Sequence, residues 1–296
     1  MTNNFVLDIL QELRANQYAP KAWVHFLHRS WRRSLEDIEA EPSLVLSWLR
    51  QTAAVSTCAS AALVWHWRRF PTARRWMQLR RVGALLGLQQ IYVLLHLGMT
   101  QPTAEAPRFE YLGVATFLSL VRGVFATLLC VAGSTDDDLY NAAIVVGAAS
   151  DVADGRIARC SGSVSRMGTM IDSISDVCFC TTATVVAVRR GALPHWFGWL
   201  TSVRFLLPIG AGCYRYFWRA QTMEAEHTSW GKIAGIMLTL LLGFSTRSPE
   251  IARRMCGPVS CVLMAASAVQ FHRAVQSEES GHGTSREQHD RTAWQR

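Results

Sequence analysis

Long apolar runs dominate the last two thirds of the chain, and short polar connections separate these runs. Most of these runs are near the length of about 20 residues that a helix needs to cross a bilayer. Backbone polar groups in lipid must be paired inside the protein, so this pattern predicts a bundle of helices. The six predicted transmembrane helices cover residues 111–133, 139–158, 168–188, 196–218, 230–244 and 255–275. The expected fold class is therefore all-α, a polytopic membrane protein with a six-transmembrane-helix bundle.

Residues 1–109 are predicted to form an N-terminal helical extension with one or two membrane-associated segments. Two apolar runs in this extension, 44–67 and 82–99, flank a basic loop with six arginines: Arg68, Arg69, Arg74, Arg75, Arg80 and Arg81. Such a loop is expected in the cytoplasm, but two full crossings before a core that starts in the cytoplasm would place it outside. Either one of the two runs lies in the interface or the charge rule is broken here, and of these we favour the incomplete crossing. The bundle is predicted to span residues 110–276, and the polar residues 277–296 to form a disordered tail.

The start of the chain also has apolar residues at helical spacing, namely Phe5, Val6, Ile9, Leu10 and Leu13. Two interpretations are open, an interfacial helix or an ordinary amphipathic helix packed on protein. Further along, residues 23–33 mix Trp, His and Arg in the way of a membrane-surface segment.

Composition fits a membrane protein, because half of the residues are hydrophobic and only 18% are charged. The formal net charge of +8 comes mostly from arginine. In so apolar a chain, this charge indicates contact with anionic lipid head groups rather than with nucleic acid, and no nucleic-acid module is visible. The eight cysteines are scattered and show neither a zinc-site spacing nor a disulfide framework.

Four aspartates lie inside or beside the apolar runs, where charge is costly unless it is paired or bound to metal. Asp151 and Asp154 are three residues apart, and Asp172 and Asp176 are four apart. Each pair therefore shares one face of a helix, and two such helices packed together would bring four carboxylates to one point. Carboxylate oxygens are the ligands that Mg²⁺ and Mn²⁺ prefer, and a pair of such ions is well suited to a phosphoanhydride.

The same stretch resembles the signature of the CDP-alcohol phosphatidyltransferases, D-x2-D-G-x2-A-R-x8-G-x3-D-x3-D. Every fixed position of the signature is present: Asp151, Asp154, Gly155, Ala158, Arg159, Gly168, Asp172 and Asp176. A calcium loop of the EF-hand type would need an alternating ligand pattern, which is absent. The resemblance covers the predicted bundle and leaves the N-terminal extension unassigned.

The resemblance implies transfer of a phosphatidyl group from CDP-diacylglycerol, or of a similar phospho-alcohol group from another CDP-linked donor, to a second alcohol, with release of CMP. Asp151, Asp154 and Asp172 would be ligands of two Mg²⁺ or Mn²⁺ ions. Asp176 would be the general base and would also touch a metal. The substrate-binding positions implied on this stretch are Gly155, Ala158, Arg159, Ser165 and Gly168. The site would face the cytoplasm, in the inner membrane of a bacterium, and a homodimer is one assembly that relatives form.

Four further cationic or polar residues are candidates for substrate contacts: Thr116, Arg122, Arg204 and Lys232. The segment from Thr116 through Ser119 to Arg122 resembles the Asn-x-Leu-Thr-x-x-Arg pattern of the family's first core helix. Arg122 could serve phosphate or pair with a core aspartate, and both interpretations are open. Arg204 lies inside an apolar run and needs a counter-ion or a phosphate. Lys232 resembles a lysine that faces the acceptor pocket in relatives, although a lysine at a helix end also extends to the interface for purely physical reasons.

Three functions compete on these observations. The first is a phosphatidyl transferase with glycerol 3-phosphate, an inositol derivative or another lipid as acceptor. The second is the related reaction in which CDP carries choline or ethanolamine and diacylglycerol is the acceptor. The third is a non-enzymatic membrane scaffold with a degenerate site. The sequence does not choose among acceptor alcohols, because no motif specifies that pocket.

Overall fold

The computed structural model describes residues 2–101, 108–133, 135–219 and 229–293, and within these residues the regular secondary structure is helical, with no strand. This confirms the predicted all-α class. The helices are α1 Thr2–Ala15, α2 Pro20–Ala40, α3 Pro42–Arg69, α4 Arg75–Leu95, the short 3₁₀ helix η1 Leu97–Met99, α5 Val114–Ala132, α6 Asp137–Cys160, α7 Arg166–Arg189, α8 His195–Arg219, α9 Ser229–Arg247 and α10 Pro249–Ala293.

The six predicted bundle helices correspond to α5 through α10, and the largest difference is at the end of the chain. The sequence predicts the last bundle helix over 255–275 and a disordered tail after it. In the structure α10 begins at Pro249, a residue whose fixed φ suits the first turn of a helix, and it continues to Ala293. The segment predicted as a disordered tail is therefore helical up to Ala293, and the domain limits stay a prediction.

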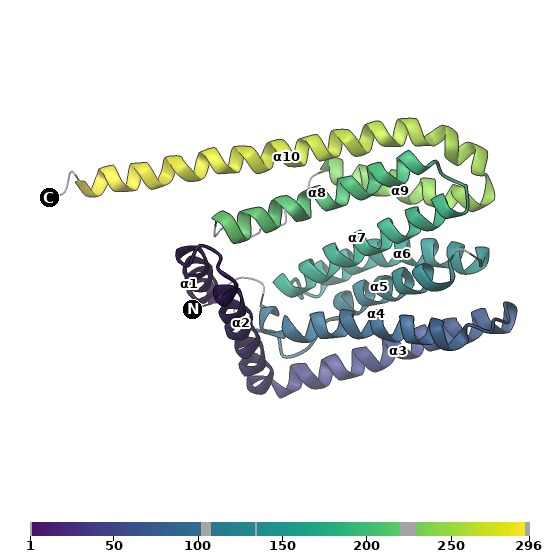
Figure 1. The fold of residues 1–296 in the computed structure, drawn as a ribbon, viewed down its shortest axis with the longest axis horizontal. Coiled ribbons are helices and arrows are strands. Elements are labelled where there is room, and N and C mark those ends of the chain that lie inside the picture. The colour runs from purple at the N-terminus through teal and green to yellow at the C-terminus, as the bar shows by residue number, and fades with distance from the viewer. Residues whose placement is uncertain (1, 102–107, 134, 220–228, 294–296) are drawn as a thin grey trace.

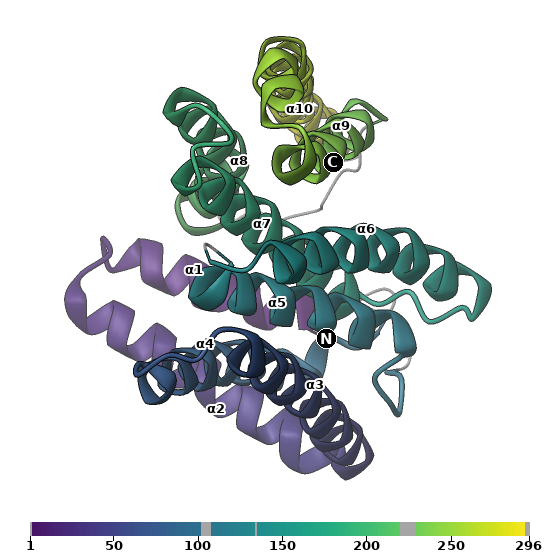
Figure 2. The same cartoon turned by 90° about the vertical axis from the view of Figure 1, so that its right-hand side faces the viewer.

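Helices α3 to α10 lie side by side along the longest axis of the molecule, while α1 and α2 lie across one end (Figure 1). Viewed along that axis, α5, α6 and α7 form a middle layer between α3 and α4 on one side and α8, α9 and α10 on the other (Figure 2). Helix α5 packs along both α6 and α7 and also contacts α3 and α4. The middle layer is therefore organised around α5.

Two apolar cores hold the layers together. One joins the middle layer to α8, α9 and α10 through residues such as Phe179, Phe197 and Leu238. The other joins it to α3 and α4 through Leu63, Val93 and others. Because α5 contributes buried residues to both cores, it lies between them.

The two ends of the bundle are named here by the helix ends that lie at them, and the far end carries ion pairs between neighbouring turns. We call the end with the first residues of α5 and α7 the near end, and the opposite end the far end. At the far end Arg69 of α3 lies 2.5 Å from Asp138, and Arg190 lies 2.7 Å from Asp137. The basic turn between α3 and α4 therefore lies beside the acidic turn that begins α6.

Helices α3 and α4 form a hairpin that runs alongside α5 (Figure 1). The physical reason is packing, because both helices bury apolar residues such as Val55 and Val82 in the core that they share with α5. The place of this hairpin relative to a bilayer stays a prediction.

The first helix is packed on protein. Ile9, Leu10 and Leu13 of α1 are buried, and α1 contacts α2 and the near end of α8. Of the two open interpretations of this segment, the structure supports the amphipathic helix packed on protein.

Among the described residues, two helices are long and apolar enough to cross a membrane by themselves, α5 and α7. Among the other four bundle helices, α6 has two aspartates in its first turn and two in the signature. The full six-span arrangement therefore stays a prediction.

Candidate active site

The site is built on three helices of the middle layer, whose ends are fixed by local sequence. Helix α6 ends in a Schellman motif, in which Ser163 N donates to the carbonyl of Ala158 at 3.0 Å. Gly162 lies at φ +62°, a left-handed conformation that glycine adopts without strain. Three residues later Ser165 caps α7 by accepting a hydrogen bond from Gly168 N at 3.0 Å. This short link turns the chain so that α6 and α7 run antiparallel.

The four signature aspartates meet where the sequence places them. Asp151 and Asp154 lie near the end of α6, and Asp172 and Asp176 in the first turns of α7. Asp154 is buried, with 6% of its side chain exposed, whereas the other three are accessible to different degrees. One carboxylate oxygen each from Asp151, Asp172 and Asp176 lie within 4.8 Å of one another.

Arg122 of α5 lies at the centre of these acids and is 1% exposed. Its Nη2 atom lies 2.6 Å from Asp154 Oδ2 and 3.5 Å from Asp151 Oδ1. Its Nη1 atom lies 2.8 Å from Asp172 Oδ1 and also contacts Asp176. The structure thus shows the second of the two interpretations of Arg122, an ion pair with core aspartates.

Two serines complete the polar cluster. Ser119, one turn before Arg122, donates to Asp154 at 3.2 Å and to Asp172 at 3.4 Å. Ser150 accepts from Arg122 Nε at 3.5 Å. The sequence interpretation missed Ser150, although a small polar residue next to Asp151 in an apolar run is a signal that could have drawn attention to it.

The cluster fits a divalent cation. Four carboxylates surround one guanidinium in the half-buried site, so the acids outnumber the cation that contacts all of them. Hard ions such as Mg²⁺ bind oxygen ligands at about 2.0–2.2 Å. The carboxylate oxygens of Asp151, Asp172 and Asp176, which lie within 4.8 Å of one another, are close enough to bind such an ion together after small movements. Arg122 would share the acids with such ions rather than compensate for all of them.

The proposed nucleotide positions gather beside the acids. The Arg159 side chain folds back over Gly155: a methyl group added at Gly155 would lie only 3.3 Å from Arg159 Nη1. A methyl group at Gly168 would lie 3.0 Å from Ser165 Oγ and 3.7 Å from Thr116 Oγ1. Thr116, Ser165 and Gly168 are therefore neighbours across α5 and α7.

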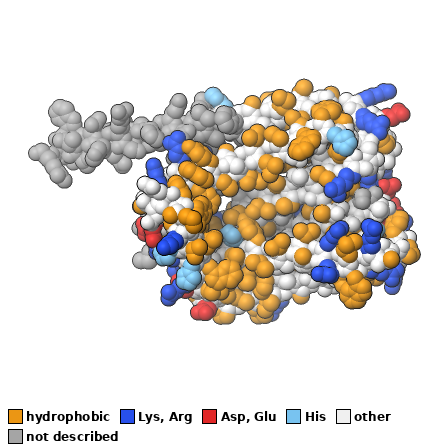
Figure 3. Space-filling view, in the orientation of Figure 1, with side chains coloured by type: hydrophobic (Ala, Val, Ile, Leu, Met, Phe, Trp, Pro, Cys, Tyr) orange, Lys and Arg blue, Asp and Glu red, His pale blue; other side chains and the backbone are white. Residues whose placement is uncertain are grey.

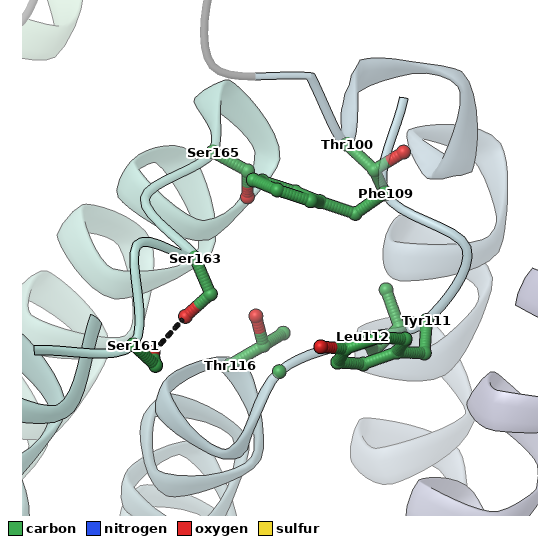
Figure 4. Close-up of a pocket in the computed structure, with 9 residues that line it drawn as sticks. Thr100, Phe109, Tyr111, Leu112, Thr116, Ser161, Ser163 and Ser165 are labelled. Atoms are coloured by element: carbon green, nitrogen blue, oxygen red, sulfur yellow. Dashed lines mark hydrogen bonds between the residues drawn. The ribbon is translucent and has the colours of Figure 1, made fainter. Parts of the chain in front are cut away.

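A small cavity of about 40 Å³ opens at this point, between the start of α5 and the link from α6 to α7 (Figure 4). Its lining is rich in hydroxyl groups: Thr100, Phe109, Tyr111, Leu112, Gly113, Thr116, Ser161, Ser163 and Ser165. Ser161 and Ser163 are joined by a hydrogen bond of 2.7 Å. The alternation of serines at 161, 163 and 165 was a sequence signal for this polar wall that the sequence interpretation did not use.

The remaining two predicted residues lie outside the acid cluster. Arg204 of α8 is nearly buried and donates to Ser267 at 2.9 Å and to Gln270 at 3.4 Å, both on α10. Lys232 is exposed in the first turn of α9. Within the described part of the chain, neither forms an ion pair with the four aspartates, so the structure does not bring these two residues to the site.

Comparison with known proteins agrees with the signature. The family model described as CDP-alcohol phosphatidyltransferase matches residues 112–270. Relatives from Mycobacterium bovis and Mycobacterium tuberculosis, both named "Putative cardiolipin synthase", are 31% identical over 157 residues, which is 52% of this chain and 71% of each relative. No solved structure matches the chain significantly.

The match covers every residue that forms the acid cluster, from Thr116 and Arg122 on α5 to Asp176 on α7. It extends over more than half of the chain, and the relatives are similar over most of their own length. The chain therefore belongs to the CDP-alcohol phosphatidyltransferase family, a family of transferases in phospholipid biosynthesis.

Proposed function

We propose that the protein transfers a phosphatidyl group from CDP-diacylglycerol to an alcohol acceptor and releases CMP. The observation that carries this proposal is the meeting of Asp151, Asp154, Asp172 and Asp176 around one point between α5, α6 and α7. An acidic cluster of this kind suits a donor whose reacting part is a pyrophosphate, since divalent ions can join the two.

The reaction exchanges one phosphorus–oxygen bond for another. The acceptor oxygen attacks the phosphorus of the phosphatidyl group, and the bond from that phosphorus to the oxygen bridging toward cytidine breaks. The bridging oxygen leaves as part of CMP. Asp176 takes the proton of the attacking hydroxyl, which requires the hydroxyl to lie within hydrogen-bond reach of its carboxylate. Asp176 suits this role because its side chain is 40% exposed and so can be reached from outside the bundle.

Asp151, Asp154 and Asp172, together with Asp176, are the residues that would hold Mg²⁺ or Mn²⁺. When bound, such ions neutralise the pyrophosphate and the leaving phosphate. Arg122 and Ser119 hold the acids close together, and so they fix the positions of the carboxylate oxygens before a donor arrives.

The nucleotide side of the donor is proposed to lie along Gly155, Ala158 and Arg159 on α6 and Thr116, Ser165 and Gly168 on α5 and α7. Gly155 offers close approach, and the exposed Arg159 guanidinium beside it is free to turn toward a phosphate. The hydroxyl-rich cavity next to Thr116 and Ser165 provides hydrogen-bond partners for a polar ligand.

A phospholipid with a free glycerol hydroxyl is the first acceptor to test. Cardiolipin has two phosphatidyl groups on one glycerol, so a synthase that forms it by phosphatidyl transfer needs phosphatidylglycerol as acceptor. The names of the two mycobacterial relatives support this choice. Arg204 and Lys232 lie on α8 and α9, away from the acids, and are proposed to contribute positive charge on the acceptor side.

The family and the two apolar helices indicate a membrane protein, and we propose that the whole bundle spans the bilayer. Exposed aromatic residues, which favour membrane–water interfaces, occur near both ends of the bundle. At the near end they are Tyr111, Tyr214, Trp218 and Trp230; at the far end they are Trp65, Phe70, Trp76, Trp196 and Trp199. On the visible face, hydrophobic side chains cover the middle, and Lys and Arg lie mainly toward the two ends (Figure 3).

The near end, with the acids, is proposed to face the cytoplasm. Arg156, Arg159 and Arg166 of the link between α6 and α7 support this orientation. The arginines at the far end oppose it, but part of their charge is compensated, since Arg69 pairs with Asp138 and Arg190 with Asp137.

The test is CMP release by the purified full-length chain in detergent with Mg²⁺ or Mn²⁺. CDP-diacylglycerol is offered with phosphatidylglycerol, glycerol 3-phosphate or inositol phosphate, one at a time. We expect CMP with one acceptor and none from Asp176→Asn, which keeps the shape of the side chain but removes the base. The matched control is Asp137→Asn, an acid on α6 whose side chain is 79% exposed at the far end.

Normal turnover by Asp176→Asn would refute the role of the base. A second outcome is that CDP-diacylglycerol gives no CMP with any acceptor, whereas CDP-choline or CDP-ethanolamine gives CMP with diacylglycerol. This outcome would show that the donor belongs to the CDP-head-group class and not to the proposed one. Silence with all donors would favour a scaffold.

A further inference from the structure

Helix α2 differs from the bundle helices in its direction and in its burial. It lies across the near end of the bundle, whereas α3 runs along the bundle (Figure 1). None of its residues is buried. A helix in this position would lie in the plane of the membrane if the bundle spans it.

One face of α2 is attached to the protein. Trp23 and Phe26 pack on Phe217 of α8, with ring centroids 5.1 and 5.9 Å apart. Further along, Ser34 donates to the carbonyl of Leu95 at 2.9 Å, and Asp37 pairs with Arg108 at 2.8 Å. These contacts fix the rotation of the helix about its own axis.

Beside the attached face runs an exposed apolar stripe. Val24, Leu27, Trp31 and Leu35 are 67%, 61%, 52% and 42% exposed. Their spacing of three, four and four residues places them in one line along the helix. We call these four residues the α2 stripe. Because so many large apolar side chains on one line are costly in water, the stripe indicates a partner.

The charges beside the stripe favour a lipid partner. Lys21, His28 and Arg32 are exposed along one side of it, and residues 20–35 contain no Asp or Glu. A basic border suits anionic head groups, and a tryptophan in the stripe suits the boundary between head groups and acyl chains. Exposed Tyr111 and Trp218, also near this end of the bundle, suit the same level.

We propose that the α2 stripe inserts into the head-group region of the leaflet on the active-site side, with α2 lying in the membrane plane. This proposal rests on the membrane-spanning bundle proposed above, and it does not require any particular substrate. Because Tyr18, in the turn before α2, donates to the carbonyl of Phe217 at 3.1 Å and stacks on Trp218, the helix would also fix the near end of α8 relative to the lipid surface.

The test uses single spin labels in the full-length chain, with its eight native cysteines replaced by serine or alanine. Labels are placed on Leu27→Cys and Trp31→Cys in the stripe and on Arg32→Cys beside it. All three positions are exposed, so the substitutions cost little stability. The protein is reconstituted in vesicles of phosphatidylcholine and phosphatidylglycerol, and collision rates with oxygen and with a water-soluble nickel chelate are measured.

We expect the oxygen-to-nickel collision ratio at 27 and 31 to exceed that at 32 at least threefold. Equal ratios at all three positions would place the stripe in water and overturn the proposal. Low collision rates with both reagents at 27 and 31 would show a protein partner, such as a second copy, and would overturn it as well.

A label at Leu88→Cys separates this proposal from the proposed function. Leu88 is 65% exposed in the middle of α4 and should be reached by oxygen but not by nickel if the bundle spans the bilayer. Nickel access at 88 would contradict the spanning bundle itself. Absence of CMP release, with the expected collision ratios at 27, 31 and 88, would contradict the enzymatic proposal and leave the α2 stripe in lipid.

Discussion

Replacement of Arg122 by methionine tests how the acid cluster is held together. Methionine fills much of the same space, but it removes the single cation that touches all four aspartates. Arg122 is 1% exposed and Asp154 has 6% of its side chain exposed, so at least this pair is shielded from water. The variant therefore leaves a buried carboxylate without its counter-charge.

The cost can be bounded from the contacts. Removing one partner of a buried ion pair costs roughly 3–5 kcal/mol. Asp151, with 57% of its side chain exposed, adds little to this figure, because exposed pairs contribute about 0–1 kcal/mol. We expect metal-free Arg122→Met to lose about 3–5 kcal/mol, which lowers the apparent Tm on the order of 10 °C.

Divalent ions should restore most of this loss, since they bring positive charge to the same carboxylates. The increase in Tm on adding Mn²⁺ should therefore be larger in Arg122→Met than in the unchanged protein. The assay is thermal unfolding of the purified protein in detergent, with EDTA or with saturating Mn²⁺. The matched control is Arg204→Met, which removes a nearly buried arginine whose partners are Ser267 and Gln270 instead of acids.

In the control, Tm should fall by the same amount with and without Mn²⁺. If Arg122→Met lost the same stability in EDTA and in Mn²⁺, the ions would not share the acids with Arg122. That result would refute the fit of the cluster to a metal site.

Three further substitutions test other parts of the account. Asp154→Ala removes a proposed ligand and should raise the Mn²⁺ concentration for half-maximal CMP release about tenfold or more. The control, Asp138→Ala at the far end, should leave this concentration unchanged. An unaltered Mn²⁺ titration in Asp154→Ala would count against the ligand role of Asp154. Gly147→Ala places a methyl group against the Phe179 ring between α6 and α7, and should lower the free energy of unfolding by about 1–3 kcal/mol. The control is Gly83→Ala, where a methyl group meets open space, and this substitution should be neutral or stabilising. Equal effects of the two substitutions on thermal unfolding would contradict the close packing beside the acids. His66→Leu removes the partner of the buried Asp136, which lies 2.8 Å from His66 at the far end. The variant should lose about 1–3 kcal/mol of stability, while CMP release per folded molecule stays unchanged. A loss of specific activity would show that the far end takes part in the reaction.

The parts of the site that could be predicted from the sequence are those that depend on local spacing. The separations of Asp151 from Asp154 and of Asp172 from Asp176 fix a common helix face, and the structure has both pairs on the expected helices. The helical periodicity near Ile9 likewise predicted a helix with one apolar face.

Periodicity identifies the apolar face of a helix but not the element that covers it. The choice between phosphate and aspartate for Arg122 therefore depended on contacts 29 to 54 residues away in sequence. For the same reason, the packing of α3 and α4 on α5 and the buried pair of His66 with Asp136 could not be deduced from one sequence. The serines at 150, 161 and 163 have weak local signals, and only the fold brings them to the site.

The most direct test of the central claim follows both halves of the donor. CDP-diacylglycerol labelled in the cytidine and in the acyl chains is incubated with the purified protein, Mn²⁺ and phosphatidylglycerol. We expect cytidine label in CMP and acyl label in a new phospholipid in equal amounts, and neither product from Asp176→Asn. Cytidine label released without an equal amount of new phospholipid, or equal product from Asp176→Asn, would contradict phosphatidyl transfer at the four-aspartate site.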